Sequence, residues 1–271
     1  MSIVQAVVLG IMQGATEFIP VSSSGHLVLV PWLFGWQEPG LAFDTLLHLG
    51  TLLAVLIVFW RDLFSLATAW LRSVTQRQSG PEARLAWWIL LATIPAAVMG
   101  ALWEERFEAL FHSPLYVAMF LLVTGLWLLL AEYLGRQERQ AEELSWWQTL
   151  LVGLAQGLAI APGISRSGAT IGAGLLLGLK REAAARFSFL LAAPIIFGAG
   201  LLQLKKLFEM PHLDAGLLPL VLGFVAAFVS GYACIRFLLA YLRRRSLIVF
   251  AVYCWLIGLV ALAVIVLSGR L

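Results

Sequence analysis

Two short polar strings interrupt an otherwise apolar sequence, and they carry residue types that act on phosphates. The first string, residues 20–26, contains three serines and a histidine, and Gln13 and Glu17 lie just before it. The second string, residues 162–168, contains two serines on either side of Arg166. A serine hydroxyl, a histidine, a carboxylate and an arginine are the groups needed to attack a phosphorus centre and to hold its oxygens. We therefore expect an anion at these strings to be transformed rather than only bound.

The spacing of these residues predicts which side chains meet. Gln13 and Glu17 are four residues apart, so in a regular helix they share a face that points toward the serine-rich loop. Ser23 and His26 are three residues apart at a helix start, close enough for hydroxyl and imidazole to contact one ligand. An arginine at membrane depth needs an acidic or anionic partner. Glu17 is the protein group that fits this role for Arg166.

The overall composition places both strings in a membrane protein. Of the 271 residues, 61% are hydrophobic and 12% are charged, against about 45–50% and about 25% in a soluble domain. This excludes a water-soluble globule and a disordered chain. The net charge of +3 gives no reason to expect nucleic acid. Cys234 and Cys254 lie in apolar runs, so they indicate neither a disulfide framework nor a metal site.

The apolar segments predict an all-α polytopic membrane protein. Runs of about 20 apolar residues can cross a hydrocarbon core of about 30 Å as helices. Two further apolar stretches, about 3–35 and 147–179, are each broken midway by one of the polar strings. Unpaired backbone groups cannot face lipid, so we interpret both stretches as re-entrant helical hairpins. The six predicted transmembrane helices lie at about 42–60, 85–103, 115–134, 187–204, 217–240 and 248–267.

The chain repeats itself at an offset of 143 residues. This offset aligns polar residues and glycines, which chance similarity between apolar segments would not select. We predict a single membrane domain, 1–271, made of repeat one at 1–140 and repeat two at 145–271, each a hairpin followed by three spans. Three spans separate the hairpins, so the second copy is inverted. The aligned pairs include Gln5 with Gln148, Gly10 with Gly153, Gln13 with Gln156, Ser22 with Ser165, Ser24 with Ser167 and Gly25 with Gly168.

The basic residues predict the orientation of the chain in the membrane. Short cytoplasmic loops collect Lys and Arg, and the loop 61–84 with the other loops on its side carries 12 of the 18 basic residues. Lys205 and Lys206 lie on the opposite side and run against this trend. Trp103 and Trp146 fall near predicted span ends, as interfacial anchors do. Both termini and the mouth of the first hairpin are therefore expected outside the cytoplasm.

The two hairpins are expected to enter from opposite faces, so that their loops meet near the membrane midplane. In each hairpin the second helix begins just after the serine-rich loop. Two helix N-termini then offer unpaired N–H groups and about half a positive charge each, which makes an anion site. Serines at the helix starts add hydroxyls, and Arg166 adds a planar guanidinium suited to phosphate.

Two motifs resemble the paired signature of a known enzyme family. They are Gln13-Gly-Ala-Thr-Glu17 followed by Pro20-Val-Ser-Ser-Ser-Gly-His26, and Pro162-Gly-Ile-Ser-Arg-Ser-Gly-Ala-Thr170. The chain resembles the bacterial undecaprenyl-diphosphate phosphatases, also called bacitracin resistance proteins, over its entire length. The resemblance implies hydrolysis of undecaprenyl diphosphate to undecaprenyl phosphate and inorganic phosphate, which recycles the lipid carrier of cell-wall synthesis. It also implies bacitracin resistance, a bacterial plasma-membrane (inner-membrane) location with the site open to the outside, and a homodimer.

The family pattern assigns roles to individual positions. It puts Glu17, Ser23, His26 and Arg166 at the catalytic centre, with Ser23 as our predicted nucleophile and Arg166 as the clamp on the diphosphate. His26 is the expected proton-transfer group, and Glu17 either orients Arg166 or holds a cation. In a competing mechanism, water attacks the phosphorus directly. The predicted phosphate-binding residues are Gln13, Ser22, Ser165, Ser167 and Thr170.

The expectation for a metal is narrow. The first position of the family motif admits Glu or Gln, and Gln13 stands there; this weakens any scheme that needs two carboxylates on a metal. A single Mg²⁺ or Ca²⁺ ion bridging Glu17 and the diphosphate is compatible with the sequence. The sequence shows no zinc-type ligand cluster, and no organic cofactor is expected.

Two further interpretations stand beside these. Inverted repeats and midplane hairpins are also typical of transporters, so a polyprenyl-phosphate transporter or flippase, with or without hydrolysis, is the alternative function. Asp44 and His48 are interpreted as structural residues, because the mouth of a span tolerates both.

Overall fold

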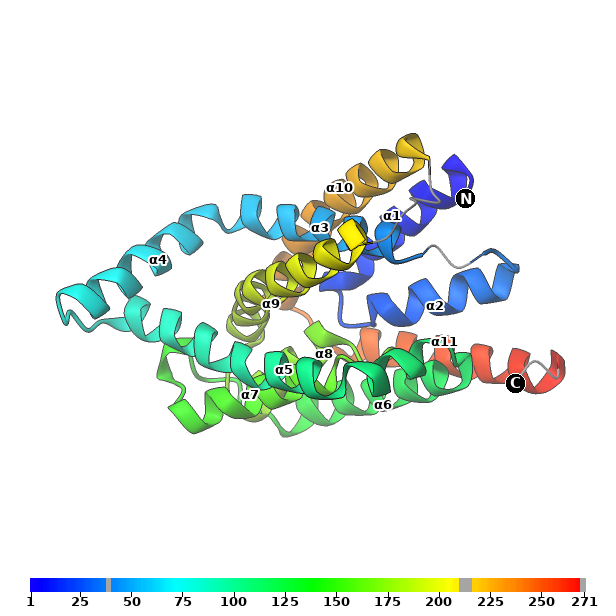
Figure 1. The fold of residues 1–271 in the computed structure, drawn as a ribbon. Coiled ribbons are helices and arrows are strands. Elements are labelled where there is room, and N and C mark those ends of the chain that lie inside the picture. The colour runs from blue at the N-terminus through cyan, green and yellow to red at the C-terminus, as the bar shows by residue number, and fades with distance from the viewer. Residues whose placement is uncertain (38–39, 210–215, 269–271) are drawn as a thin grey trace.

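The computed structural model describes residues 1–37, 40–209 and 216–268. Within these ranges every regular element is a helix, and β-type pairing is limited to one bridge between Arg139 and Leu179. The predicted all-α class is therefore confirmed. The helices in Figure 1 are α1 (Ile3–Phe18), α2 (Ser23–Phe34), α3 (Leu41–Val58), α4 (Trp60–Thr75), α5 (Pro81–Phe111), α6 (Pro114–Leu134), the short 3₁₀ turn η1 (Ala141–Glu143), α7 (Trp146–Leu158), α8 (Arg166–Leu176), α9 (Arg181–Glu209), α10 (Leu217–Leu242) and α11 (Ile248–Ser268).

Six of these helices are long and apolar enough to cross a membrane, as predicted: α3, α5, α6, α9, α10 and α11. Two of them extend beyond their predicted ends. Helix α5 begins at Pro81 and continues to Phe111 past a kink at Trp103 (φ −125°, ψ 24°), and α9 begins at Arg181. Proline suits the first helical turn because its missing N–H needs no partner there. Hydropathy identifies the apolar part of a helix but not its polar extensions, so these two helices are predicted too short.

Helix α4 lies mostly in the segment 61–84, which the sequence pattern predicts to be a loop. The structure shows a 16-residue helix, Trp60–Thr75, in which Leu66 is buried and Trp60 and Phe64 are exposed. Its charged residues keep its mean hydropathy below that of a span. The helix projects with the start of α5 as an arm from one end of the bundle (Figure 1).

The second helix of each predicted hairpin starts with the same local structure. The Ser22 hydroxyl accepts a hydrogen bond from the Gly25 N–H (3.2 Å) at the start of α2. The Ser165 hydroxyl accepts one from the Gly168 N–H (3.0 Å) at the start of α8. Both are N-caps, which satisfy amides that have no partner inside the helix. These matching caps are compatible with the predicted repeat, whose boundaries at 1–140 and 145–271 stay a prediction.

Both broken segments turn back on themselves within the fold. Helices α1 and α2 open toward the end of the bundle where α1 begins and α11 ends, and α7 and α8 open toward the opposite end (Figure 1). Arg139 ties the ends of the second pair together, since its Nη1 donates to Gln148 Oε1 (3.4 Å) and to the Leu177 carbonyl (3.3 Å). This arrangement is compatible with re-entrant hairpins of opposite direction. Their entry into a membrane from opposite faces stays a prediction.

Glycines allow the first hairpin to lie directly against α10. A Cβ on Gly14 would come within 2.3 Å of the Ala227 carbonyl oxygen, and one on Gly10 would come within 2.4 Å of the Gly223 oxygen. Small residues at this spacing let helix backbones approach closely. The contact fixes the position of α1, and therefore of Glu17 near its end.

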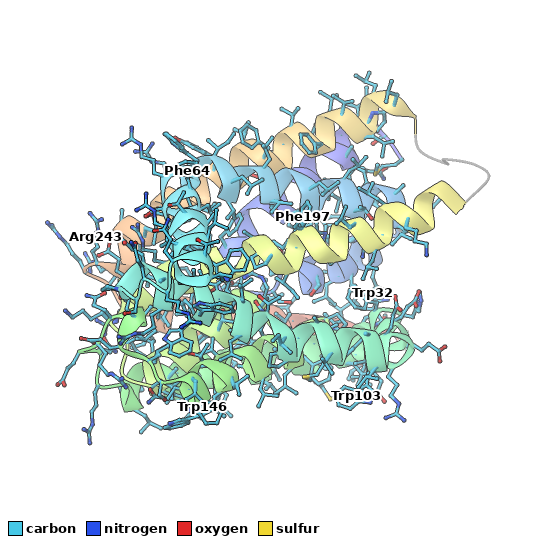
Figure 2. The ribbon with its side chains drawn as sticks, turned by 60° about the vertical axis from the view of Figure 1, so that its left-hand side comes forward. Trp32, Phe64, Trp103, Trp146, Phe197 and Arg243 are labelled. Carbon is cyan, nitrogen blue, oxygen red and sulfur yellow. The ribbon has the colours of Figure 1, made fainter. Side chains whose placement is uncertain are left out.

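Exposed tryptophans mark the two ends of the bundle. Trp103 and Trp146 are 42% and 60% exposed. They lie at opposite ends, with Arg243 at the end of Trp146 (Figure 2). Tryptophan is enriched at membrane interfaces, so these positions fit a bundle whose helices run between two interfaces.

Candidate active site

The loop between α1 and α2 contacts the loop between α7 and α8. The Ser22 hydroxyl accepts a hydrogen bond from the Gly163 N–H (3.1 Å). In the other direction, the Ser167 hydroxyl donates to the Ile19 carbonyl (3.3 Å). The two polar strings of the sequence therefore meet in space, and the N-termini of α2 and α8 lie beside this junction. Their first amides lack partners within the helix.

Glu17, near the end of α1, is the centre of the cluster. Its Oε1 accepts hydrogen bonds from Arg166 Nε (3.3 Å) and Nη2 (3.1 Å). Its Oε2 accepts from the Ser23 hydroxyl (2.6 Å) and from the Gln13 amide (3.2 Å). Glu17 is 7% exposed and Gln13 is completely buried. A buried carboxylate needs partners of this kind. The structure therefore brings these four predicted site residues together around the Glu17 carboxylate, whose negative charge is balanced by the Arg166 guanidinium.

The contact between Ser23 and Glu17 adds a role to those expected for Glu17. Glu17 was expected to orient Arg166 or to hold a cation, and it does contact Arg166. It also accepts the hydrogen bond of the Ser23 hydroxyl at a distance typical of a short O–H···O⁻ bond. The carboxylate, rather than an imidazole, is therefore the group in position to take the proton of Ser23.

His26 lies in the same loop region but both of its ring nitrogens have partners outside the cluster. Nδ1 is 2.7 Å from the Ser22 carbonyl and Nε2 is 2.8 Å from the Tyr253 hydroxyl. A carbonyl only accepts, so Nδ1 carries the proton and Nε2 of the neutral ring accepts from the tyrosine. His26 and Ser23 therefore have different hydrogen-bond partners, and the predicted proton transfer by His26 stays a prediction.

Arg166 has a second anchor on α9. Its Nη1 donates to the Ser188 carbonyl (3.3 Å). The Ser188 hydroxyl lies 2.7 Å from the Thr170 hydroxyl, which also donates to the Arg166 carbonyl (2.9 Å). Thr170 is thereby joined to the cluster by a buried network that fixes the first turn of α8 and the direction of the guanidinium.

The predicted phosphate-binding serines hold the loops in shape. Ser22 and Ser165 cap α2 and α8, and Ser165 and Ser167 have their hydroxyls 3.1 Å apart. All three are buried, at 2% exposure or less. Their hydroxyls have protein partners here, so their part in phosphate binding stays a prediction.

Three residues of this region were not predicted as site residues: His48, Ser188 and Tyr253. His48 was interpreted as structural, but its Nε2 is 4.0 Å from Glu17 Oε2 and its side chain is 34% exposed. The sequence offers one signal for His48, which is a polar residue inside an apolar span. Ser188 and Tyr253 belong to no motif, so the sequence gives no signal for them. Asp44 accepts a hydrogen bond from His48 Nδ1 through its main-chain oxygen (2.8 Å).

The donors of the cluster suit a hard cation better than zinc. In the described ranges, no three His, Cys, Asp or Glu side chains are grouped so that they could hold a metal ion. Gln13 Oε1 is buried without a hydrogen-bond partner there, next to the Glu17 carboxylate. Mg²⁺ and Ca²⁺ bind oxygen ligands, so these two groups could contribute to a site that a diphosphate completes.

Comparison with known proteins identifies the family. A family model described as Bacitracin resistance protein BacA matches residues 6–260. The chain belongs to the BacA family. An undecaprenyl-diphosphatase of Moorella thermoacetica is 47% identical over 264 residues, which cover 97% of this chain and 98% of that protein. An undecaprenyl-diphosphatase of Rubrobacter xylanophilus is 47% identical over 271 residues (98% and 100%), and one of Methanosphaera stadtmanae is 44% identical over 273 residues (97% and 98%).

Membership of the BacA family agrees with the resemblance carried by the two motifs. The relatives are named as phosphatases, so the alternative of a transporter or flippase is not favoured. The contact between the two loops joins the motifs that define this resemblance, although they lie more than a hundred residues apart.

Proposed function

We propose that this BacA-family chain is an integral-membrane phosphatase that hydrolyses undecaprenyl diphosphate to undecaprenyl phosphate and inorganic phosphate. The reaction recycles the lipid carrier of cell-wall synthesis and confers bacitracin resistance, because that drug sequesters the diphosphate. The observation that carries the proposal is the Glu17 carboxylate, which joins the Ser23 hydroxyl on one oxygen and the Arg166 guanidinium on the other. The names of the close relatives support the substrate.

Ser23 is the nucleophile in this proposal. Its proton passes to Glu17 Oε2, 2.6 Å away, while its oxygen forms a bond to the terminal phosphorus. The bond from that phosphorus to the bridging oxygen breaks, and undecaprenyl phosphate leaves with the electron pair. Water then attacks the phosphoseryl group, inorganic phosphate leaves, and the Ser23 oxygen regains a proton from Glu17.

Arg166 and the helix N-termini stabilise the charge of the diphosphate. Three donors of the guanidinium are used by Glu17 and the Ser188 carbonyl, so two of the five donors of an arginine remain for phosphate oxygens. The N-termini of α2 and α8 add partial positive charge. Groups of this kind act on the charge that moves to the bridging oxygen as its bond to phosphorus breaks.

His26 serves as the proton-transfer group of the second step. Its Nε2 is the basic nitrogen and accepts the hydrogen bond of the Tyr253 hydroxyl, so it can take up a proton of the attacking water through that hydroxyl, which gives its own proton to Nε2 and receives one from the water. Glu17 and Gln13 would hold a single Mg²⁺ or Ca²⁺ if the reaction uses one. Such an ion would neutralise phosphate charge.

The test is phosphate release by purified protein in detergent from a polyprenyl diphosphate. We expect Ser23→Ala to abolish turnover, because no other oxygen nucleophile contacts Glu17 in the described ranges. Ser24→Ala is the matched control: its hydroxyl lies 3.3 Å from that of Ser22 and does not contact Glu17, so most activity should remain. Substantial hydrolysis by Ser23→Ala would support direct attack by water. A chelator added to the wild type measures any need for a metal.

The same preparation separates hydrolysis from transport. Translocation of a polyprenyl phosphate in liposomes without phosphate release would contradict the phosphatase proposal. Two finer features belong to it: both termini and the mouth of the site lie outside the cytoplasm, supported by the distribution of basic residues, and the chain is a homodimer, supported by the family resemblance alone. Light scattering of the detergent-solubilised protein measures the oligomeric state.

A further inference from the structure

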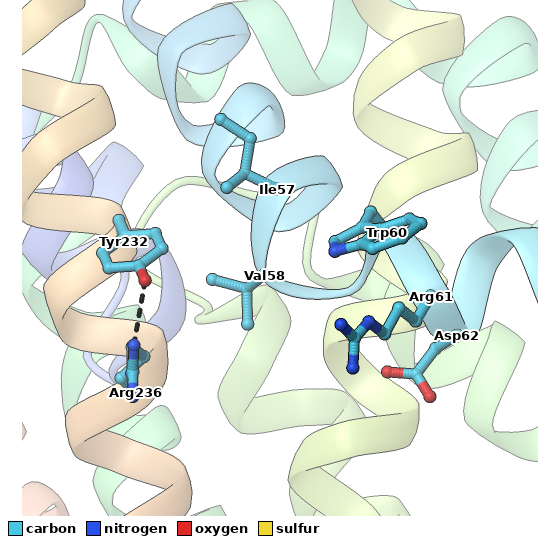
Figure 3. Close-up of a pocket in the computed structure, with 7 residues that line it drawn as sticks. All are labelled: Ile57, Val58, Trp60, Arg61, Asp62, Tyr232 and Arg236. Atoms are coloured by element: carbon cyan, nitrogen blue, oxygen red, sulfur yellow. Dashed lines mark hydrogen bonds between the residues drawn. The ribbon is translucent and has the colours of Figure 1, made fainter.

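A cavity of about 400 Å³ lies away from the candidate active site, where α3 ends, α4 begins and α10 passes. Figure 3 shows Tyr232 and Arg236 on α10 facing Trp60, Arg61 and Asp62 across the end of α3. None of the residues that line the cavity belongs to the cluster around Glu17. Its volume is in the range of small-molecule sites. The lining is Ile57, Val58, Trp60, Arg61, Asp62, Tyr232 and Arg236.

Two arginines of this cavity have aromatic partners and no acidic one. The Arg61 guanidinium lies 5.2 Å from the centre of the Trp60 ring. Arg236 Nη1 donates to the Tyr232 hydroxyl (2.9 Å), and its guanidinium lies 5.7 Å from the Tyr232 ring centre. In the part of the chain that the structure describes, neither guanidinium forms an ion pair with a carboxylate. Both side chains are exposed.

The one carboxylate of the cavity is already neutralised. Asp62 forms an ion pair with Arg186 of α9. The immediate surroundings therefore contain three guanidiniums and one carboxylate, which leaves the cavity electropositive. An anion that enters meets no unpaired negative charge among the lining residues.

The position of Arg236 favours an anionic partner in a bilayer. It lies inside α10, a helix long and apolar enough to span a membrane. An arginine in such a helix pairs with an anion, a carbonyl or the interface. Neighbouring Phe237 is 53% exposed and Trp60 is 58% exposed, so the cavity opens on an apolar surface. This surface suits the acyl chains of a lipid. A free phosphate ion has no such chains, so the surface favours a lipid ligand.

We propose that this cavity binds the headgroup phosphate of an anionic membrane phospholipid. Arg61 and Arg236 hold the phosphodiester oxygens from two sides, and the acyl chains lie against the exposed apolar side chains of α3 and α10. Basic pockets between transmembrane helices on the cytoplasmic side are typical sites for such headgroups. The site is separate from the hydrolytic one, so it does not depend on the proposed reaction.

The test measures lipid retention by native mass spectrometry of the full chain in detergent, with phosphatidylglycerol, phosphatidylcholine or inorganic phosphate added. We expect the wild type to retain phosphatidylglycerol preferentially. Each of Arg61→Gln and Arg236→Gln should weaken this retention by about five-fold, and the double variant by more. Arg72→Gln removes an exposed arginine from the same helix α4 and is the matched control, which should retain the lipid as the wild type does.

Three outcomes contradict the proposal. Equal retention by the double variant means that the arginines do not hold the lipid. An equal loss in Arg72→Gln means that general surface charge accounts for it. Displacement of phosphatidylglycerol by millimolar inorganic phosphate means that the cavity recognises a free anion. Phosphate release from a detergent-dispersed diphosphate, unchanged in the double variant, shows that the variant is folded.

Discussion

At the scale of single residues, the site depends on how one buried negative charge is shared. Glu17 accepts from a serine, an amide and a guanidinium at the same time. Removing one partner of a buried ion pair leaves the other charge without compensation, which is more costly than loss of the pair's own attraction. Substitutions of Glu17 alone therefore mix stability with catalysis. Substitutions of Arg166 that keep its positive charge report on catalysis more directly.

Arg166→Lys is such a substitution. Lysine preserves the positive charge but lacks the planar fork that contacts Glu17 and the Ser188 carbonyl together. We expect kcat for phosphate release to fall about 10²- to 10³-fold, with a folded protein in size-exclusion chromatography. Arg243→Lys alters a surface pair with Glu182, in which the arginine side chain is 64% exposed, and should leave kcat within about two-fold of the wild type. A wild-type kcat in Arg166→Lys would show that bidentate geometry is not needed.

Tyr253→Phe tests whether the tyrosine positions His26. The substitution removes a 2.8 Å hydrogen bond to Nε2, and a neutral bond of this kind contributes about 0.5–1.5 kcal/mol. We expect kcat to fall about two- to ten-fold with KM nearly unchanged. Tyr133→Phe, at a tyrosine that is 71% exposed, is the control. A change in Tm with unaltered kcat would assign Tyr253 a structural role only.

At the scale of elements, the geometry of the junction depends on the loop before α8. Gly163 has φ of +97° and a Cβ at this position would lie 2.4 Å from the Val117 carbonyl oxygen. Its N–H also donates to Ser22, and its carbonyl accepts from Thr124 (2.9 Å). The residue therefore combines a backbone conformation that favours glycine, a close approach to α6, and bonds to two neighbouring elements.

Gly163→Ala should consequently disturb both stability and activity. A left-handed conformation costs a non-glycine residue about 1–2 kcal/mol, and the clash with α6 adds about 1–3 kcal/mol. We expect Tm to fall by about 5 °C or more and phosphate release to fall with it. Gly198→Ala is the control, because no heavy atom lies within 4 Å of its added Cβ. Equal Tm values for the two variants would contradict this account of the loop.

The elements also show what could be predicted from sequence and what could not. The two polar strings were recognisable because each is contiguous, and the pairing of Arg166 with Glu17 follows from the cost of an unpaired charge at membrane depth. The contact of Tyr253 with His26 joins residues 227 positions apart, and no local pattern encodes it. His48 reaches Glu17 only because α3 packs beside α1. Hydropathy does not predict α4, because it identifies only helices that are apolar enough to cross a membrane.

At the scale of the whole molecule, the bundle has two unlike ends. The start of α1, the end of α11 and the open end of the first pair of helices lie together (Figure 1), whereas the arginine-rich connections lie at the other end. Short loops rich in arginine stay in the cytoplasm. If the chain follows this rule, a diphosphate exposed on the outer leaflet can approach the first hairpin directly. The orientation therefore decides from which side the substrate enters.

Cysteine labelling in intact bacterial cells measures this orientation. The natural cysteines are replaced first by Cys234→Ala and Cys254→Ala, and single cysteines are then introduced by Gln37→Cys or Gln78→Cys. Gln37 and Gln78 are exposed and lie beyond α2 and α4, respectively. A membrane-impermeant maleimide should label position 37 in intact cells and position 78 only after the cells are opened, because position 78 belongs to the arginine-rich end. The reverse pattern would place the first hairpin on the cytoplasmic side, and the proposed substrate would then have to reach the site from the inner leaflet.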